Sequence, residues 1–123
     1  MSGDKLFIDS NILLYFLKGE KEIVEIISEK ELVISFITEL ELLSFSNLSS
    51  SDEKNIKGLL KSCQIINLNE EIKALTIELK RKYKLKLPDA IIASTAYYFN
   101  LPILTADKQF KQVEELEVII YQF

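Results

Sequence analysis

The sequence predicts an α/β fold in which a parallel sheet of about five strands is flanked by helices on both faces. Short apolar runs alternate with longer segments of helical periodicity along the 123 residues. Apolar residues make up 48% of the chain, and glycine and proline are scarce, so the chain can bury a compact core. A chain of this length favours one domain, which we place at residues 1–123.

The expected strands are short apolar runs that end at a polar residue or a turn. Their residue ranges are 5–8, 32–35, 64–68, 103–105 and 118–121. Apolar runs of this length are typical of strands that are buried on both faces of a parallel sheet. Because the carboxyl ends of parallel strands meet at one edge of the sheet, we expect polar residues that follow the strands to lie together there.

Helical periodicity and capping residues predict the helices of the first half of the chain. Apolar spacing indicates helices over residues 11–17 and 20–27. Thr38 and Glu41 match the S/T-x-x-E capping box, which predicts that the third helix begins at Thr38. Three consecutive serines indicate a loop before a fourth helix over about residues 52–61.

The helices of the second half have similar signals. Asn69 is expected to cap a helix that ends in the basic residues 80–82. Pro88 suits the first position of the next helix, which continues to Tyr98 and is apolar on all sides, so we expect it to be buried. Asp107 can cap a short helix after the fourth strand.

Residue types that are absent or rare restrict the possible chemistry. The chain has no histidine, which excludes histidine acid–base catalysis, Ser–His or Cys–His nucleophiles and the usual zinc sites. Its three glycines cannot form a P-loop or a dinucleotide-binding fingerprint. The single cysteine, Cys63, is expected to be an ordinary buried thiol at the start of a strand. An enzyme built from this chain must therefore use carboxylates and a metal ion.

Hydropathy gives no sign of a membrane protein. No apolar run is long enough to cross a bilayer, and the first residues lack the basic and apolar regions of an export signal. We therefore expect a cytoplasmic protein that does not contact a membrane.

Four acidic residues lie where an apolar run ends and a helix can begin: Asp9, Glu41, Asp89 and Asp107. Each has an ordinary explanation as a helix cap, a capping-box partner or a first-turn acid stabilised by the helix dipole. Both interpretations can hold, because helix N-termini lower the electrostatic cost of clustered carboxylates. Gathered at one edge of the sheet, the four acids predict a site for a divalent cation with oxygen ligands.

Four stretches, taken in order, are more specific than any single acid. They are FIDSNIL at 7–13, SFITELELL at 35–43, LPDAIIASTA at 87–96 and ILTADKQF at 103–110. The ordered set resembles the PIN-domain family, and in particular the VapC-type ribonuclease toxins of prokaryotic toxin–antitoxin pairs. The resemblance implies a three-layer PIN-like domain and a metal-dependent endoribonuclease that hydrolyses RNA phosphodiester bonds.

The resemblance also implies a site. It assigns catalysis and the binding of Mg²⁺ or Mn²⁺ to four acids: Asp9, Glu41, Asp89 and Asp107. Asp9 and Asp89 are the expected direct ligands, and Asn11 and Thr105 match polar positions that steady the cluster in such proteins.

Two features in or just after the second stretch bear on the resemblance. Glu39 competes with Glu41 for the acidic position, and we prefer Glu41 because it matches the family's E-L-L. Phe45 stands where the family often has glycine, which raises a question about local packing but leaves the acids unchanged.

The charge distribution does not decide whether the protein binds nucleic acid. A formal net charge of −4 is unfavourable for binding phosphates. Basic residues at 80–86 precede Asp89, however, and two lysines follow Asp107, so cations can flank the acids. The competing explanation is a solvated helix end whose cations suit the dipole. Tyr83 in this tract can stack on a base or pack against the protein.

The resemblance further implies RNA as the substrate, a homodimer, and inhibition by a cognate antitoxin that covers the active-site groove. A catalytically inactive PIN-fold module that binds RNA or protein is the alternative. A phosphoacceptor signalling domain also uses strand-end acids, but it pairs the acid after its first strand and has its acceptor Asp in mid-chain. Here Asp9 is unpaired, and no aspartate ends the third expected strand.

Overall fold

A computed structural model describes residues 4–122 and contains one five-stranded sheet. The strands are β1 (Lys5–Ile8), β2 (Glu31–Ser35), β3 (Gln64–Ile66), β4 (Ile103–Thr105) and β5 (Val118–Ile120). All neighbouring strands are parallel, in the order β3-β2-β1-β4-β5. β1 is therefore central, between β2 and β4, and the expected parallel sheet is confirmed.

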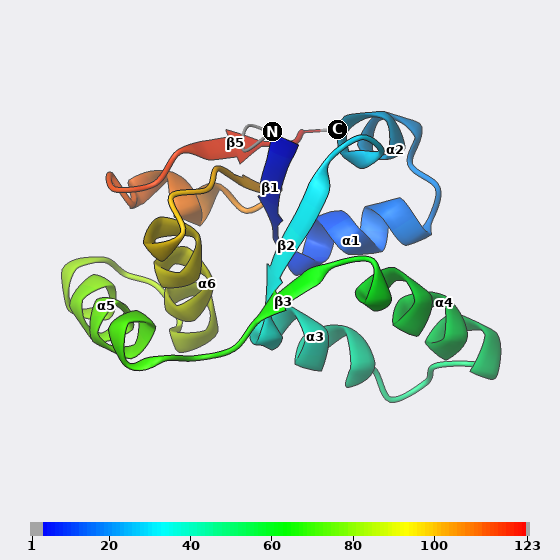
Figure 1. The fold of residues 1–123 in the computed structure, drawn as a ribbon, viewed down its shortest axis with the longest axis horizontal. Helices are drawn as coiled ribbons and strands as arrows, with labels where there is room; N and C mark the ends of the chain where they lie inside the picture. Colours follow the sequence, from blue (N-terminus) through cyan, green and yellow to red (C-terminus); the bar gives the residue numbers. More distant parts are fainter. Residues whose placement is uncertain (1–3, 123) are drawn as a thin grey trace.

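Helices cover both faces of the sheet. Their bounds are α1 (Ser10–Leu17), α2 (Lys21–Ile27), α3 (Phe36–Leu43), α4 (Ser50–Lys61), α5 (Glu70–Lys82), α6 (Leu87–Tyr98) and the 3₁₀ helix η2 (Lys108–Gln112). Figure 1 shows α1 to α4 on one side of the strands and α5 and α6 on the other. The expected three-layer arrangement is therefore confirmed.

Alternating side chains of the central strand connect the two helical layers. Leu6 and Ile8 of β1 belong to the buried cluster formed with α1 to α4. Phe7, between them, belongs to a second cluster formed with α5, α6 and η2. All three side chains are at most 5% exposed, as expected for a strand with no solvated face. Burial on both faces fixes the position of β1, and with it the position of Asp9, which follows the strand.

The start of α3 differs from the sequence prediction. The helix begins at Phe36, and its N-cap is Ser35, whose Oγ accepts a 3.1 Å hydrogen bond from the Ile37 amide. Thr38 and Glu41 therefore do not form a capping box, and that prediction was wrong. The reason is that β2 passes into α3 without a loop, so its last residue already serves as the cap.

Other differences are boundary shifts of one or two residues. α4 begins at Ser50 instead of residue 52, and β3 ends at Ile66 instead of residue 68. Pro88 occupies the second position of α6 instead of the first, while the helix is buried as expected from Ala90 to Ala96. Cys63 is only partly buried, just before β3.

Two further findings concern the surface. No helix between residues 4 and 122 is long and apolar enough to cross a membrane. Phe45, which replaces the family's frequent glycine, lies beyond the end of α3 with 47% of its surface exposed. Its ring therefore does not have to fit into the core.

Candidate active site

Asp9 lies at the carboxyl end of the central strand and is only 6% exposed. It caps α1, because its Oδ1 accepts a 2.8 Å hydrogen bond from the Ser10 amide. Its Oδ2 accepts a 2.7 Å hydrogen bond from the Thr105 hydroxyl at the end of β4. Burial raises the pKa of Asp9; the two hydrogen bonds oppose this, and the charges of Glu41 and Asp107 add to it. Asp9 is thus both a helix cap and a member of an acidic group.

Hydrogen bonds fix the segment after β4 beside the start of α1. The Asp107 amide donates to Thr105 Oγ1 at 3.0 Å, and the Ala106 amide donates to Asn11 Oδ1 at 3.3 Å. Asp107 caps η2, as predicted, with its Oδ1 accepting from the Gln109 amide at 2.9 Å. Asn11 and Thr105 therefore occupy the steadying positions that the family resemblance implied.

Glu41 reaches the acidic group from α3. Its Oε1 accepts a 2.9 Å hydrogen bond from the Ser10 hydroxyl, and its side chain is exposed. Its charge contributes to the raised pKa values of Asp9 and Asp89, whereas Glu39 is not among the charges that shift either. The structure therefore favours Glu41 over Glu39 as the acid that α3 contributes.

Asp89 lies in the first turn of α6, as predicted, and is half-buried. Burial is the largest cause of a pKa raised from 3.8 to about 6. The charges of three acids raise it further, namely Asp9, Asp107 and Glu41, while Lys86 lowers it. The charge of each of the other three predicted acids therefore acts on Asp89.

The structure brings the four predicted acids together at one edge of the sheet. They come from segments that follow β1 and β4 and from the helices α3 and α6. Within residues 4–122, however, no three acidic or cysteine side chains are already arranged as a shell around one ion. The two findings are compatible, because charges act on one another over distances longer than a metal–ligand bond. Mg²⁺ also usually takes only one or two carboxylates and keeps several water molecules.

Ser10 is a site residue that sequence reasoning did not single out. Its amide binds Asp9 and its hydroxyl binds Glu41, so it joins two of the acids. The sequence signal was the Asp-Ser-Asn run at the end of the first strand, in which the serine directly follows a predicted site acid.

A second group of polar contacts, which we call the Tyr83 clasp, lies away from the four acids. The Tyr83 hydroxyl donates to Glu115 Oε1 at 2.6 Å and accepts from the Glu114 amide at 3.2 Å. Lys82 Nζ forms an ion pair with Glu115 Oε2 at 3.1 Å. The clasp connects the turn between α5 and α6 to the segment after η2. Tyr83 therefore has a structural role in the basic tract.

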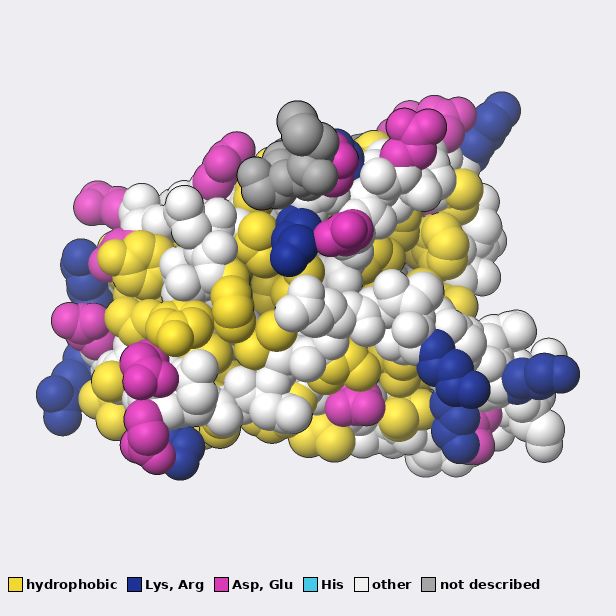
Figure 2. Space-filling view, viewed as in Figure 1, with side chains coloured by type: hydrophobic (Ala, Val, Ile, Leu, Met, Phe, Trp, Pro, Cys, Tyr) yellow, Lys and Arg dark blue, Asp and Glu magenta, His cyan; other side chains and the backbone are white. Residues whose placement is uncertain are grey.

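Charges of both signs mix on the surface around α5. Figure 2 shows lysine or arginine side chains interspersed with acidic ones on this side of the molecule. Lys80, Arg81 and Lys82 occupy the last turn of α5, where cations suit the helix dipole. These residues fit the solvated helix end, while Lys86 is the cation of the tract that acts on Asp89.

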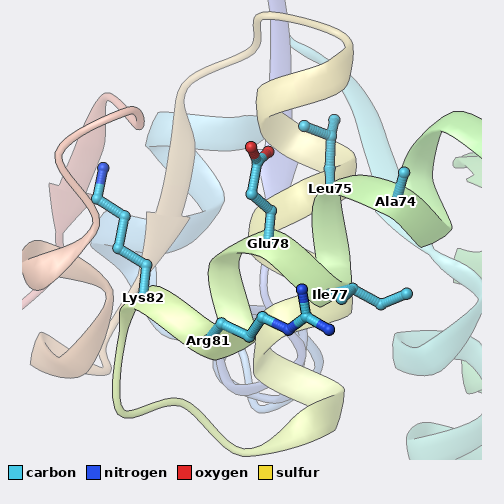
Figure 3. A pocket seen from close by; sticks show the side chains of 6 residues that line it. All are labelled: Ala74, Leu75, Ile77, Glu78, Arg81 and Lys82. Carbon is cyan, nitrogen blue, oxygen red and sulfur yellow. The ribbon is translucent and has the colours of Figure 1, made fainter.

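A shallow cavity of about 460 Å³ runs along α5 and is separate from the acidic group. Figure 3 shows its lining side chains on successive turns of that helix: Ala74, Leu75, Ile77, Glu78, Arg81 and Lys82. None of them belongs to the group of four acids. The electrostatics of the acids, and not this cavity, identify the candidate site.

Comparisons with known proteins agree with the fold. Ribonuclease VapC2 from Methanocaldococcus jannaschii is 33% identical, over 97% of this chain and 95% of the relative. A toxin–antitoxin complex from Klebsiella pneumoniae contains a chain with 29% identity and a TM-score of 0.83, covering 96% of this chain and 99% of that one. VapBC-1 from nontypeable Haemophilus influenzae gives 25% identity and a TM-score of 0.82, over 94% and 97% of the two chains.

The family itself follows from a match to the PIN domain over residues 6–116, which includes all four acids. The match spans most of the chain. This chain therefore belongs to the PIN-domain family.

Proposed function

We propose that this protein is a VapC-type endoribonuclease that hydrolyses RNA phosphodiester bonds with Mg²⁺ or Mn²⁺. We assign the metal and the catalysis to four residues: Asp9, Glu41, Asp89 and Asp107. The observation that carries the proposal is the convergence of four acids from distant segments in a chain that is 33% identical to ribonuclease VapC2. Burial and the charges of the other three acids raise the pKa of Asp89 to about 6. Asp9 and Asp107 also cap helices, but capping does not require the four carboxylates to act on one another, and a divalent cation would relieve their repulsion.

The donor set fits such a cation. All four side chains offer carboxylate oxygens, which suit Mg²⁺ and Mn²⁺. Asp9 and Asp89 are the proposed direct ligands, since burial raises the pKa of each. When bound, the cation supplies an activated water and neutralises charge on the phosphate.

Residues of the chain orient this site. Ser10 and Thr105 hold one oxygen of Asp9 each, so the carboxylate cannot rotate freely. Lys86 and Lys108 are exposed and adjoin the acids, so they are the proposed contacts for RNA phosphates. Glu41 is exposed at the edge of the site, where it can adjust as a substrate arrives.

The partners follow from the family and the relatives. We propose RNA as the substrate, a homodimer as the assembly, and a cognate antitoxin as the inhibitor. Relatives with comparable folds were solved as a toxin–antitoxin complex and as VapBC-1. An RNA substrate also makes the cytoplasm the proposed place of action.

Cleavage of an end-labelled single-stranded RNA by the purified protein tests the proposal. We expect cleavage with Mg²⁺ or Mn²⁺, none with EDTA, and none from Asp89→Asn. Asp52→Asn is a matched control, because Asp52 lies in the first turn of the exposed helix α4. Cleavage by folded Asp89→Asn that is undiminished in EDTA would reject the proposal. RNA binding without cleavage by the wild type would favour the inactive binding module instead.

A further inference from the structure

The hydroxyl of Thr38 is the one buried side-chain polar atom between residues 4 and 122 that has no hydrogen-bond partner. Thr38 lies in α3 and its side chain is fully buried. Leaving a buried hydroxyl unpaired costs about 1 to 3 kcal/mol, so such a group calls for an explanation.

Other buried hydroxyls on helices of this protein show what Thr38 lacks. The hydroxyls of Thr76, Ser94 and Thr95 each donate to the carbonyl four residues earlier, at 2.7 to 2.8 Å. The residue four positions before Thr38 is Ile34, which belongs to β2 and precedes the helix. Thr38 therefore cannot use the intrahelical acceptor that the others use.

Thr38 lies between two points where α3 meets the acidic group. The register of Phe7 with Val33 places Ser35, the cap of α3, level with Asp9. One turn after Thr38, Glu41 binds the Ser10 hydroxyl. Helical side chains lean toward the N-terminus, and residues three apart are neighbours, so the Glu41 side chain extends back over the turn that contains Thr38.

We propose that Thr38 is a positioning residue that donates a hydrogen bond to the Glu41 carboxylate when a divalent cation occupies the site. This inference rests on the proposed metal-dependent function. Glu41 is exposed and is held by Ser10, and its charge acts on those of Asp9 and Asp89. A cation at the site would offset this repulsion, so the Glu41 carboxylate could move inward, where Thr38 and Ser10 would hold it together.

Stability measured in EDTA and in a Mg²⁺ titration tests this role without relying on activity. Thr38→Val keeps the shape but removes the hydroxyl. We expect its melting temperature in EDTA to equal or exceed that of the wild type, because an unpaired group is removed. The Mg²⁺ concentration that raises the melting temperature by one fixed amount, which we call the Mg²⁺ midpoint, should rise about tenfold, as for the loss of a group that orients a metal ligand.

Two variants separate this role from packing. Thr38→Ser retains the hydroxyl and should keep the wild-type Mg²⁺ midpoint, even if it melts earlier. Thr76→Val is the matched control, because that buried hydroxyl is satisfied within α5 and should leave the midpoint unchanged.

A double-mutant cycle with Glu41→Ala identifies the acceptor. If Thr38 acts through Glu41, Thr38→Val should shift the Mg²⁺ midpoint in the wild type but not in the Glu41→Ala background. An unchanged midpoint in Thr38→Val, or an equal shift in both backgrounds, would overturn the proposal. A wild type whose melting temperature does not respond to Mg²⁺ or Mn²⁺ would instead show that the proposed metal site is wrong.

Discussion

Asp9 and Glu115 are two carboxylates that each accept two hydrogen bonds, yet their pKa values shift in opposite directions. Glu115 accepts from Tyr83 and from Lys82, and these contacts, the Tyr83 bond foremost, lower its pKa. Asp9 accepts from Ser10 and Thr105, but burial dominates and raises its pKa. The number of hydrogen bonds therefore does not separate the two groups.

The first difference is burial, because Asp9 is 6% exposed whereas Glu115 is only partly buried. The second is the sign of the neighbouring charges. Glu115 has the ammonium group of Lys82 beside it, so the protein itself neutralises this carboxylate. Asp9 has the charges of Glu41 and Asp107 nearby, which add to the cost of its burial. The charges of the Tyr83 clasp are therefore balanced within the protein, whereas the acidic site, as proposed, would take a cation from outside.

The largest expected effect is on catalysis. Asp9→Asn should reduce the rate of RNA cleavage about 100-fold or more, because a bound metal ion contributes several kcal/mol to the transition state. Glu115→Gln, which also neutralises a carboxylate with two hydrogen bonds, should change the rate only a few-fold. The comparison is measured with initial rates on one labelled RNA at saturating Mg²⁺. Equal losses in both variants would contradict the distinction between the two carboxylates.

The next effect is stabilisation by the cation. At about 100 times its dissociation constant, Mg²⁺ should stabilise the native state by about 2.7 kcal/mol, which raises the melting temperature by several degrees. Glu115→Gln should retain this shift and Asp89→Asn should lose most of it, as measured by calorimetry with and without EDTA. A full Mg²⁺ shift in Asp89→Asn would remove Asp89 from the site.

A smaller effect is expected from the Tyr83 clasp. Tyr83→Phe removes the donor to Glu115 and the acceptor of the Glu114 amide, and should lower the unfolding free energy by about 1.5 kcal/mol. Urea denaturation measures the change. Tyr98→Phe at the exposed end of α6 is the control and should change it by less than about 0.5 kcal/mol. A Tyr83→Phe variant as stable as the control would mean that the clasp contributes nothing.

The smallest expected effect is on the pH dependence of stability in EDTA, and it comes from the charge of Asp89. Its pKa of about 6 in the folded protein exceeds the ordinary 3.8, so the ionised form destabilises the fold. Stability in EDTA should therefore fall as the pH rises from about 4 through 6, and Asp89→Asn should be more stable above this range. We expect a gain of about 1 kcal/mol, after reducing the full value for solvent screening of this half-exposed group. Chemical denaturation at pH 4 and pH 8 measures this gain. An Asp89→Asn variant that is less stable than the wild type at pH 8 would contradict the prediction.

Local signals in the sequence were sufficient for much of this architecture. Uninterrupted apolar runs predicted the strands, and Asn69 and Asp107 were correctly expected as caps because a cap depends on its own next few residues. The Thr38 to Glu41 motif failed because Ser35, at the end of a strand, competed for the same helix start. The predicted end of this strand, at residue 35, was correct, but the sequence did not show that the helix follows it without a loop.

Contacts between distant segments had no sequence signal of their own. The Ser10 hydroxyl meets Glu41 across 31 positions, and Tyr83 meets Glu115 across 32. The sequence contained the four acids and the rule that strand ends converge, which made their assembly predictable as a group. It did not contain the side-chain partners of each acid, because exposed polar residues fit many arrangements equally well before the packing is known.

The order of strands in the sheet also determines when the proposed site can form in a newly synthesised chain. The hydrogen bond between Thr105 and Asp9 spans 96 positions, and β4 must insert beside β1 before Asp107 can approach the other acids. A chain still on the ribosome therefore lacks the proposed cleavage centre until most of its length has been translated.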